Sequence, residues 1–305
     1  MPALVLVPGR FHIRCRKRSR RDQSRTFAQP HPRGQGPVLT AGAHDGLGAV
    51  LAERAGYRAV WASGLEVSAA HGVPDIGLLG ISDYLAAART MNQACGLPVI
   101  ADCDTGFGNE LNAAYTVQQY EAAGIAAICI EDKVFPKVNS FAGHRQMLAP
   151  TGEFAHKISV AKASQKDPDF MVIARTEALI AGAGMDEAMD RAHAYADAGA
   201  DAILIHSKAK THAEVEEFMS RWSGRLPVVI VPTTYYEWSA SDAARAGASI
   251  VIHANQGLRA TVTAMMSAFS IMLNDGCSSA LEGQIASVKE IFDLQRMDQW
   301  LELEA

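Results

Sequence analysis

Short apolar runs alternate with amphipathic helical stretches along nearly the whole chain from residue 37 onward. Eight of these runs are rich in Val, Ile and Ala and turn polar at their C-terminal ends: residues 37–45, 57–64, 97–106, 125–133, 170–179, 202–208, 226–235 and 249–256. Continuous apolar runs of this length are typical of parallel strands that are buried on both faces. The pattern therefore predicts eight strands that alternate with helices.

Four of the helical stretches end in the same way, with an Ala-Gly pair shortly before the next strand. The glycines are Gly56, Gly124, Gly199 and Gly247. Glycine suits the left-handed position that closes a helix, so each is predicted to be a helix cap. Eight units of helix, glycine and strand predict an α/β fold, a (β/α)8 TIM-type barrel. An open doubly wound sheet is the alternative, although no G-x-G-x-x-G motif follows the first strand.

Two further helical stretches follow the eighth run, at residues 258–273 and 286–304. The second lies beyond what closure of a barrel requires, so we expect it to pack on a partner subunit. The expected organisation is a basic N-terminal arm, residues 1–36, followed by a catalytic barrel with a C-terminal helical extension, residues 37–305.

Charge is distributed unevenly between the arm and the rest of the chain. Residues 1–35 hold nine Lys or Arg and one acid, so their net charge is +8. Because the whole chain has a net charge of −5, the remaining residues carry −13. The arm has too little apolar surface to offset its ordering entropy, and we expect it to be disordered. The favoured interpretation is a solvated tail, or upstream sequence included through a misplaced start codon, ahead of a targeting peptide or a nucleic-acid-binding segment.

The composition is that of a folded soluble protein. Apolar residues make up 49% and charged residues 20% of the chain, and no apolar stretch approaches the ~20 residues that a membrane-spanning helix needs. The five cysteines are odd in number and form no C-x-x-C pair, so they predict reduced thiols in a cytoplasmic protein. They are Cys15, Cys95, Cys103, Cys129 and Cys277.

Polar residues gather at the C-terminal ends of the predicted strands. A barrel brings these ends to one mouth, where such folds carry their chemistry. We therefore expect one site built from the following residues: Trp61, Ser63, Gly64, Leu65, Asp75, Asp102, Asp104, Glu131, Lys137, Asn139, Ser140, Arg175, Glu177 and His206.

The carboxylates of this set predict a metal site. Several acids around one opening repel one another unless a cation lies among them. Oxygen ligands without a Cys or His cluster favour a hard divalent ion such as Mg²⁺. Asp102 and Asp104 are two residues apart, so both are expected to point the same way along a strand. The alternative is that this acidic strand end only caps the following helix.

Arg175, His206 and Lys137, together with Mg²⁺, predict a site for an anionic substrate that carries phosphoryl and carboxylate groups. Each has a purely structural alternative. Arg175 would then form a buried ion pair with Glu177 or another acid of the barrel, and His206 would be a hydrogen-bonded core histidine. Trp61 is either a wall of the pocket or a core residue.

Five segments together resemble the phosphoenolpyruvate mutase branch of the isocitrate lyase superfamily. They occur in family order: WASGLEVSA, DCDTGFGN, EDKVFPKVNS, ARTEALIAG and LIHSK. The resemblance runs from about residue 37 to the last helix. It implies a modified barrel whose last helix is swapped between subunits, in a homodimer or homotetramer. It also implies an Mg²⁺ ion held mainly by Asp102, which Asp75, Asp104 and Glu131 reach largely through water.

The resemblance implies roles for the remaining residues of the site. Ser63, Gly64 and Leu65 would bind the carboxylate end of the substrate. Arg175 and His206 would contact its anionic groups.

A gating loop would close over the substrate, and its sequence separates the branches of the family. The loop contains Lys137, Asn139 and Ser140. Lyases of the superfamily carry a K-x-C-G-H type of loop, whereas this chain has no cysteine there. Related phosphonopyruvate hydrolases tend to have Thr where this chain has Asn139.

The resemblance therefore implies an isomerase that interconverts phosphoenolpyruvate and 3-phosphonopyruvate, with phosphonopyruvate hydrolysis as the alternative. Because formation of the carbon-phosphorus bond is uphill in this family, we expect a phosphonopyruvate decarboxylase as the pathway partner. A nucleic-acid-binding protein that acts through the basic arm is a third and least favoured function.

Overall fold

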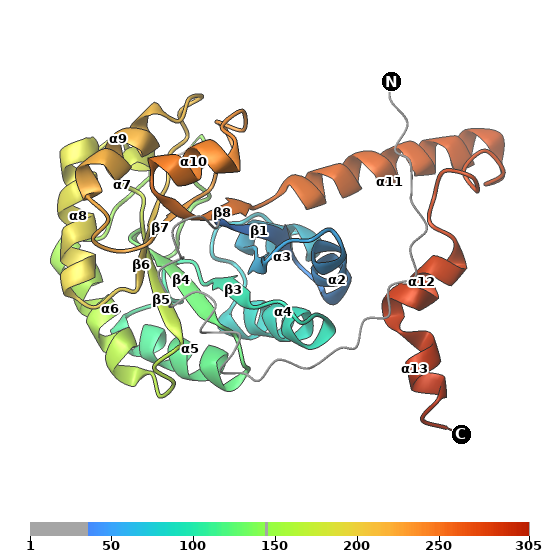
Figure 1. Cartoon of the computed structure of the whole chain (residues 1–305), viewed down its shortest axis with the longest axis horizontal. Coiled ribbons are helices and arrows are strands. Elements are labelled where there is room, and N and C mark those ends of the chain that lie inside the picture. Colours follow the sequence, from blue (N-terminus) through green and yellow to red (C-terminus); the bar gives the residue numbers. More distant parts are fainter. Residues whose placement is uncertain (1–35, 144–145, 305) are drawn as a thin grey trace.

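The eight predicted strands form a closed parallel barrel in the computed structural model, which describes residues 36–143 and 146–304 (Figure 1). Each strand pairs with the next, and β8 pairs with β1. The strands are β1 Val38–Ala43, β2 Ala59–Ala62, β3 Val99–Asp102, β4 Ala127–Glu131, β5 Met171–Thr176, β6 Ala202–Ile205, β7 Val228–Ile230 and β8 Ala248–His253. The barrel is confirmed against the open sheet. Apart from Gly36, the predicted arm lies outside the described residues.

Helices surround this barrel, and two short ones were not anticipated from the sequence. The short helices α3 and α7 begin directly after the ends of β2 and β5, at the mouth of the barrel. The helices are α2 Gly46–Arg54, α3 Gly64–Ala70, α4 Ile81–Ala94, α5 Glu110–Ala122, α6 Thr151–Ser164, α7 Ala178–Ala181, α8 Met185–Asp197, α9 Ala213–Trp222, α10 Ala240–Ala246, α11 Gln256–Asp275, α12 Val288–Gln295 and α13 Met297–Leu301.

The glycine caps are confirmed by their backbone angles. Gly56, Gly124, Gly199 and Gly247 have φ values of 89°, 79°, 97° and 120°. Residues that carry a Cβ atom rarely adopt such backbone angles, whereas glycine adopts them with little strain. Glycine therefore ends these helices at little cost in conformational energy. Each cap turns the chain back into the barrel within a few residues.

Alternation along the strands determines which side chains enter the mouth. In β2, Trp61 packs with the residues inside the barrel, while Val60 packs with the outer layer beneath the helices. The same inner cluster contains Ile173 of β5 and Leu204 of β6. Because side chains alternate between the two faces of a strand, the residue two positions after an inner residue also points inward. The apolar core therefore positions the residues that form the site.

The C-terminal helices leave the barrel. Helix α11 projects away from it, and α12 and α13 follow at a distance from the strands (Figure 1). The predicted stretch 286–304 is divided in two, because Arg296 has a left-handed φ of 56° between α12 and α13. Within the described residues, no helix is both long enough and apolar enough to cross a membrane.

Gly42 in β1 provides a test of the barrel's packing. A Cβ atom at this position would lie 2.2 Å from the carbonyl oxygen of Ala254, a backbone atom that cannot move aside alone. We expect Gly42→Ala to destabilise the protein by about 1–3 kcal/mol, the usual cost of overpacking. The midpoint of urea unfolding measures this effect.

Gly152→Ala is the matched control, since an added Cβ there meets nothing within 4 Å on helix α6. It should be neutral or stabilising by up to about 1 kcal/mol. Equal unfolding midpoints for Gly42→Ala and the wild type would contradict the packing argument.

Candidate active site

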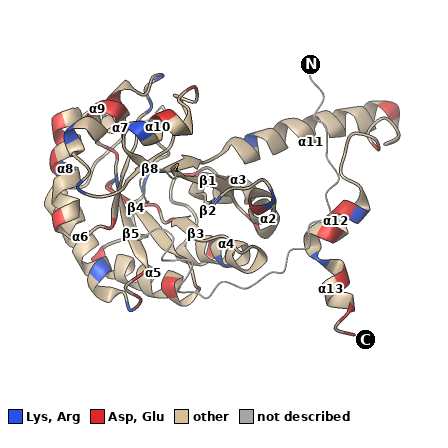
Figure 2. Cartoon of the chain, viewed as in Figure 1, with Lys and Arg blue, Asp and Glu red and all other residues tan. Residues whose placement is uncertain are grey.

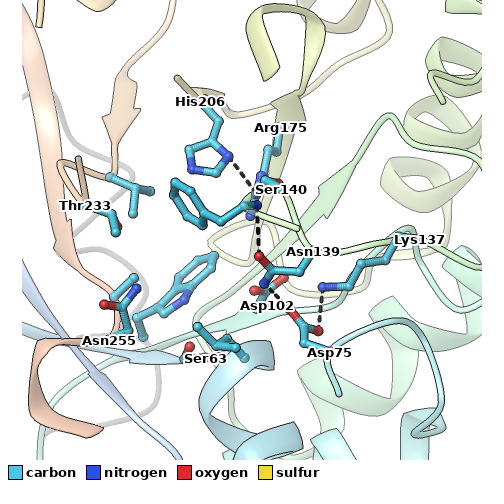
Figure 3. Close-up of a pocket in the computed structure, with 15 residues that line it drawn as sticks. Ser63, Asp75, Asp102, Lys137, Asn139, Ser140, Arg175, His206, Thr233 and Asn255 are labelled. Atoms are coloured by element: carbon cyan, nitrogen blue, oxygen red, sulfur yellow. Dashed lines mark hydrogen bonds and ion pairs between the residues drawn. The ribbon is translucent and has the colours of Figure 1, made fainter. Parts of the chain in front are cut away.

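A pocket opens at the C-terminal ends of the strands, where the sequence predicted the site (Figure 3). Ten of the predicted binding, catalytic and metal residues line it: Trp61, Ser63, Leu65, Asp75, Asp102, Lys137, Asn139, Ser140, Arg175 and His206. The other three lie directly behind this wall. Gly64 donates its N–H to Asp102 at 3.4 Å, Asp104 lies against Lys137, and Glu131 lies against Arg175.

Strand alternation explains most of this convergence. Asp102, Arg175 and His206 each lie two residues after a side chain of the inner core. Asp104 does not fit this rule, and the prediction that it continues the strand is wrong. Strand β3 ends at Asp102, and Asp104 adopts a positive φ of 49° in the following turn. The turn nevertheless buries its carboxylate beside the pocket.

The acidic side of the pocket is organised around the ammonium group of Lys137. Its Nζ lies 2.6 Å from Oδ1 of Asp75 and 3.1 Å from Oδ1 of Asp104. Burial would lower the pKa of Lys137, but the surrounding carboxylates outweigh burial and raise it well above its usual value. Lys137 is therefore a cation here.

The carboxylates behind Lys137 are unusually easy to protonate. Burial raises the pKa of Asp102, although Lys137 and Arg175 oppose this shift. Burial likewise raises the pKa of Asp104, to about 7, against the effect of Lys137. Buried carboxylates with raised pKa values lack the solvation and positive charge that their ionised forms need.

The chemistry of this donor set fits Mg²⁺. Oδ1 of Asp104 and Oε1 of Glu131 are buried and have no hydrogen-bond partner among the described residues. Each of them faces a lysine ammonium, Lys137 at 3.1 Å and Lys133 at 3.6 Å. Carboxylate oxygens are the ligands that a hard divalent cation prefers. However, no three Asp, Glu, His or Cys side chains in the described part of the chain are grouped as a metal site. The set of metal ligands stays a prediction.

The opposite side of the pocket is a cluster of Arg175 and His206 around Glu177, called the Glu177 cluster below. Arg175 Nε lies 2.5 Å from Oε1 of Glu177 and 3.2 Å from Oε2 of Glu131. His206 Nδ1 lies 2.7 Å from the same oxygen of Glu177 and 2.8 Å from Nη2 of Arg175. The ion pair that was the alternative role of Arg175 is therefore present, while the side chain also lines the pocket.

Protonation in this cluster follows from burial and from the guanidinium. Burial and the charge of Arg175 lower the pKa of His206, so this imidazole is mainly neutral at pH 7. Burial would raise the pKa of Glu177, but Arg175 holds it well below its usual range. The cluster thus combines a permanent cation, a permanent anion and a neutral imidazole.

The loop expected to be the gate, residues 134–143, is called the gate below; it lines the pocket and is bonded to Asp75. Asn139 Nδ2 donates to Oδ2 of Asp75 at 2.6 Å, and its backbone N–H donates to the Asp75 carbonyl at 3.1 Å. Lys137 donates a hydrogen bond to the other carboxylate oxygen of Asp75. Both oxygens of Asp75 therefore bind the gate in this structure (Figure 3).

Five pocket residues were missed by sequence reasoning. They are Phe141, Val231, Thr233, Ala254 and Asn255. Thr233 and Ala254 lie two residues after the inner core residues Val231 and Ile252, so the alternation rule could have found them. Phe141 packs edge-on against His206 at 5.6 Å between ring centroids, a long-range contact that the sequence does not reveal.

Two curated relatives are similar over most of their lengths. The chain is 46% identical over 273 residues to "Phosphonopyruvate hydrolase" of Variovorax sp. (strain Pal2), which covers 88% of this chain and 94% of the relative. It is 47% identical over 260 residues to "Phosphoenolpyruvate phosphomutase" of Streptomyces hygroscopicus, which covers 85% and 83%.

Two solved structures share the fold. A phosphoenolpyruvate phosphomutase from Streptomyces platensis subsp. rosaceus has a TM-score of 0.90 and 52% identity, over 93% of this chain and 97% of that one. A phosphonopyruvate hydrolase in complex with oxalate and Mg²⁺ has a TM-score of 0.83 and 45% identity, over 88% and 93%.

The family profile described as "Phosphoenolpyruvate phosphomutase" matches residues 27–273, most of the chain. This match agrees with the resemblance of the five sequence segments and with the closed barrel. The chain is an enzyme of the phosphoenolpyruvate phosphomutase family, within the isocitrate lyase superfamily.

Proposed function

We propose that this enzyme interconverts phosphoenolpyruvate and 3-phosphonopyruvate by moving a phosphoryl group within one bound molecule. The observation that carries the proposal is the place of Asn139, on a gate that crosses the pocket, where it lines the same cavity as Arg175 and His206. An amide donates hydrogen bonds to phosphoryl oxygens but is a poor general base for water. Asn139 therefore suits rearrangement better than hydrolysis.

The substrate would lie between the two charged sides of the pocket. Its phosphoryl group is assigned to Arg175, His206 and Asn139, since a guanidinium offers paired donors to such oxygens. Its carboxylate end is assigned to Ser63 and Leu65, which line the same cavity beside helix α3. This assignment uses the Glu177 cluster for the group that migrates.

Mg²⁺ is assigned to the acidic side. Asp102 would be its main ligand, supported by Asp75, Asp104 and Glu131. When bound there, the ion supplies positive charge that stabilises the enolate oxygens. The relative whose structure contains oxalate and Mg²⁺ supports the assignment, because that protein covers most of this chain at 45% identity.

The isomerisation balances within the substrate itself. The bond between phosphorus and the enol oxygen breaks, a bond between phosphorus and C3 forms, and the enol becomes a ketone. No proton or water molecule enters. Such transfers pass through a loose, metaphosphate-like state, so the protein must hold the fragment in register and exclude water. Phe141 and Asn139 supply this cover from the gate.

Phosphonopyruvate hydrolysis is the second candidate. Relatives named for the two reactions have almost the same identity to this chain, 47% and 46%. The two reactions start from the same bound phosphonopyruvate and differ in whether water captures the phosphoryl group. A test must therefore identify which product contains the phosphorus, phosphoenolpyruvate or free phosphate.

We also propose a second copy of this chain as a partner, seated on α11. The exposed side chains Val262, Met265, Met266, Phe269 and Leu273 recur at spacings of three and four residues along this helix, and so share one face. The helix carries only Arg259 and Asp275 as charges, as Figure 2 shows. The dimer or tetramer implied by the resemblance would cover this face.

Two further proposals concern the cellular setting. The thiols Cys95, Cys103 and Cys129 are buried and free, which supports a reducing, cytoplasmic location. A decarboxylase acting on phosphonopyruvate is proposed as the next enzyme, since removal of this product would draw an uphill isomerisation forward.

Phosphorus NMR of the full-length enzyme with phosphonopyruvate and Mg²⁺ tests the proposed reaction. We expect phosphoenolpyruvate to form, and Asn139→Ala to lower the rate by about 10²–10³-fold if its amide stabilises the migrating group. Asn92→Ala, whose amide bonds a distant backbone carbonyl, is the control and should keep the wild-type rate. Stoichiometric phosphate without phosphoenolpyruvate would establish the hydrolase instead.

Asp102→Ala tests the metal assignment. We expect it to abolish Mg²⁺-dependent turnover and to weaken binding of Mg²⁺ with oxalate by at least ~tenfold, since even residues outside the ligand shell cost 10–100-fold. Isothermal titration calorimetry measures the second effect without turnover. Asp190→Ala, an exposed carboxylate on α8, should change neither quantity. Unchanged Mg²⁺ dependence in Asp102→Ala would remove Asp102 from the site.

Phe269→Glu tests the partner on α11. A charge in the middle of a buried apolar contact costs several kcal/mol, so the variant should dissociate at concentrations where the wild type is a dimer or tetramer. Sedimentation velocity gives the oligomeric state. Tyr236→Glu, an exposed aromatic elsewhere, is the control and should not change it. A monomeric wild type would contradict the proposal.

A further inference from the structure

Lys133 is a buried lysine at the mouth of the barrel that does not line the pocket. It lies two residues after the end of β4, and only 3% of its surface is exposed. Removing an ammonium group from water is costly unless close partners replace the lost hydration. The position of Lys133 therefore depends on the groups that surround its Nζ atom.

The partners of Lys133 belong to two different parts of the molecule. On the gate, Nζ donates to the carbonyl of Val138 at 2.9 Å and to Oγ of Ser140 at 2.8 Å. On the barrel, it lies 2.9 Å from Oε2 of Glu177 and 3.6 Å from Oε1 of Glu131. An ammonium has three protons, and the three shortest contacts use all of them.

Ser140 links this ammonium to the Glu177 cluster. Its hydroxyl donates to Oε2 of Glu177 at 2.5 Å and accepts from Lys133 and from Nη2 of Arg175, the latter at 3.1 Å. One donor and two acceptors are all that a hydroxyl offers, so Ser140 is fully bonded only while the gate lies in this position. The other oxygen of Glu177 holds Arg175 and His206.

We propose that Lys133 is a positioning residue that couples closure of the gate to the orientation of the Arg175 and His206 side chains. When the gate lies across the pocket, Lys133 and Ser140 complete the bonds to Glu177 that fix this carboxylate. When the gate lifts, both gate contacts of Lys133 break, and Glu177 loses the Ser140 hydroxyl. Closure and orientation of the phosphoryl-binding groups are then one event.

A purely structural role differs in its consequences. A lysine that only neutralises Glu131 and Glu177 would stabilise the barrel ends whether or not the gate is closed. A coupling lysine also sets how often the gate opens. The proposal rests on the proposed function only where turnover is measured, so one arm of the test uses no turnover.

Hydrogen-deuterium exchange of the full-length protein with Mg²⁺ and oxalate tests the coupling. In Lys133→Met, the gate amides at 138–142 should exchange at least ~tenfold faster, because bonds from a charged donor to the gate are lost. Strands β4 and β5 should exchange as in the wild type. Lys162→Met removes another partly buried lysine, paired with Asp201, and should leave the gate unchanged. Wild-type gate exchange in Lys133→Met would overturn the proposal.

Ser140→Ala is the second variant, and it keeps every charge around Lys133. It should also accelerate exchange of the gate, and an unaltered gate would overturn the proposal even if Lys133→Met does not fold.

Turnover of phosphonopyruvate supplies the remaining arm. The losses in kcat/KM for Lys133→Met and Ser140→Ala should be non-additive in the double variant, because both variants break the same hydrogen-bond network around Glu177. The ratio of phosphate to phosphoenolpyruvate should rise in each, because a looser gate admits water. Additive losses with an unchanged product ratio would refute the coupling. If the wild type forms neither product, the proposed function fails, and the exchange arm alone decides the role of Lys133.

Discussion

The side of the pocket that contains Arg175 and His206 depends on one buried carboxylate, that of Glu177. This residue has no exposed surface, so its charge is stabilised only by the donors around it. Arg175 and His206 share one of its oxygens, and Ser140 and Lys133 share the other. The directions of these four side chains are therefore not independent, and the pocket presents Arg175 and His206 as one linked set.

The acidic side of the pocket also needs compensating charge, but here a cation compensates several buried carboxylates. Asp75, Asp102 and Asp104 lie close together, and burial raises the pKa of the latter two. The gate supplies the nearest compensating charge through Lys137, and it supplies an amide donor through Asn139. The segment that crosses the pocket thus also balances the charge beneath it. Covering the pocket and neutralising its acids are inseparable in this arrangement.

The sequence predicted the barrel and most of the pocket because both follow from local rules. Glycine caps and apolar runs define the strands, and alternation carries Asp102, Arg175 and His206 into the mouth. Asp104 does not follow the alternation because it lies in a turn with a positive φ, and residue spacing in the sequence does not reveal such a turn. The place of Lys133 at the mouth follows from the end of β4, but its contacts do not follow from the sequence. Its partner Glu177 is distant in sequence, and the choice of partners depends on how the gate folds back.

Arg175 illustrates a limit of choosing between a structural and a functional role. The sequence leaves its ion pair with an acid and its place in the pocket wall as alternatives, but one side chain does both. Near a binding site, a guanidinium with five donors is able to satisfy a buried acid and still present N–H groups to a ligand. The ion pair is what keeps those groups in place.

Helix α11 begins at the pocket wall, since Asn255, which lines the cavity, is also its N-cap residue. The helix has 20 residues, so it is a rod about 30 Å long whose far end lies outside the barrel. The close approach of β1 to Ala254 clamps the near end of this rod. A force applied to the far end of α11 by a neighbouring molecule would tilt the helix, and with it the part of the cavity wall that Asn255 forms. The length of the helix would act as the lever arm.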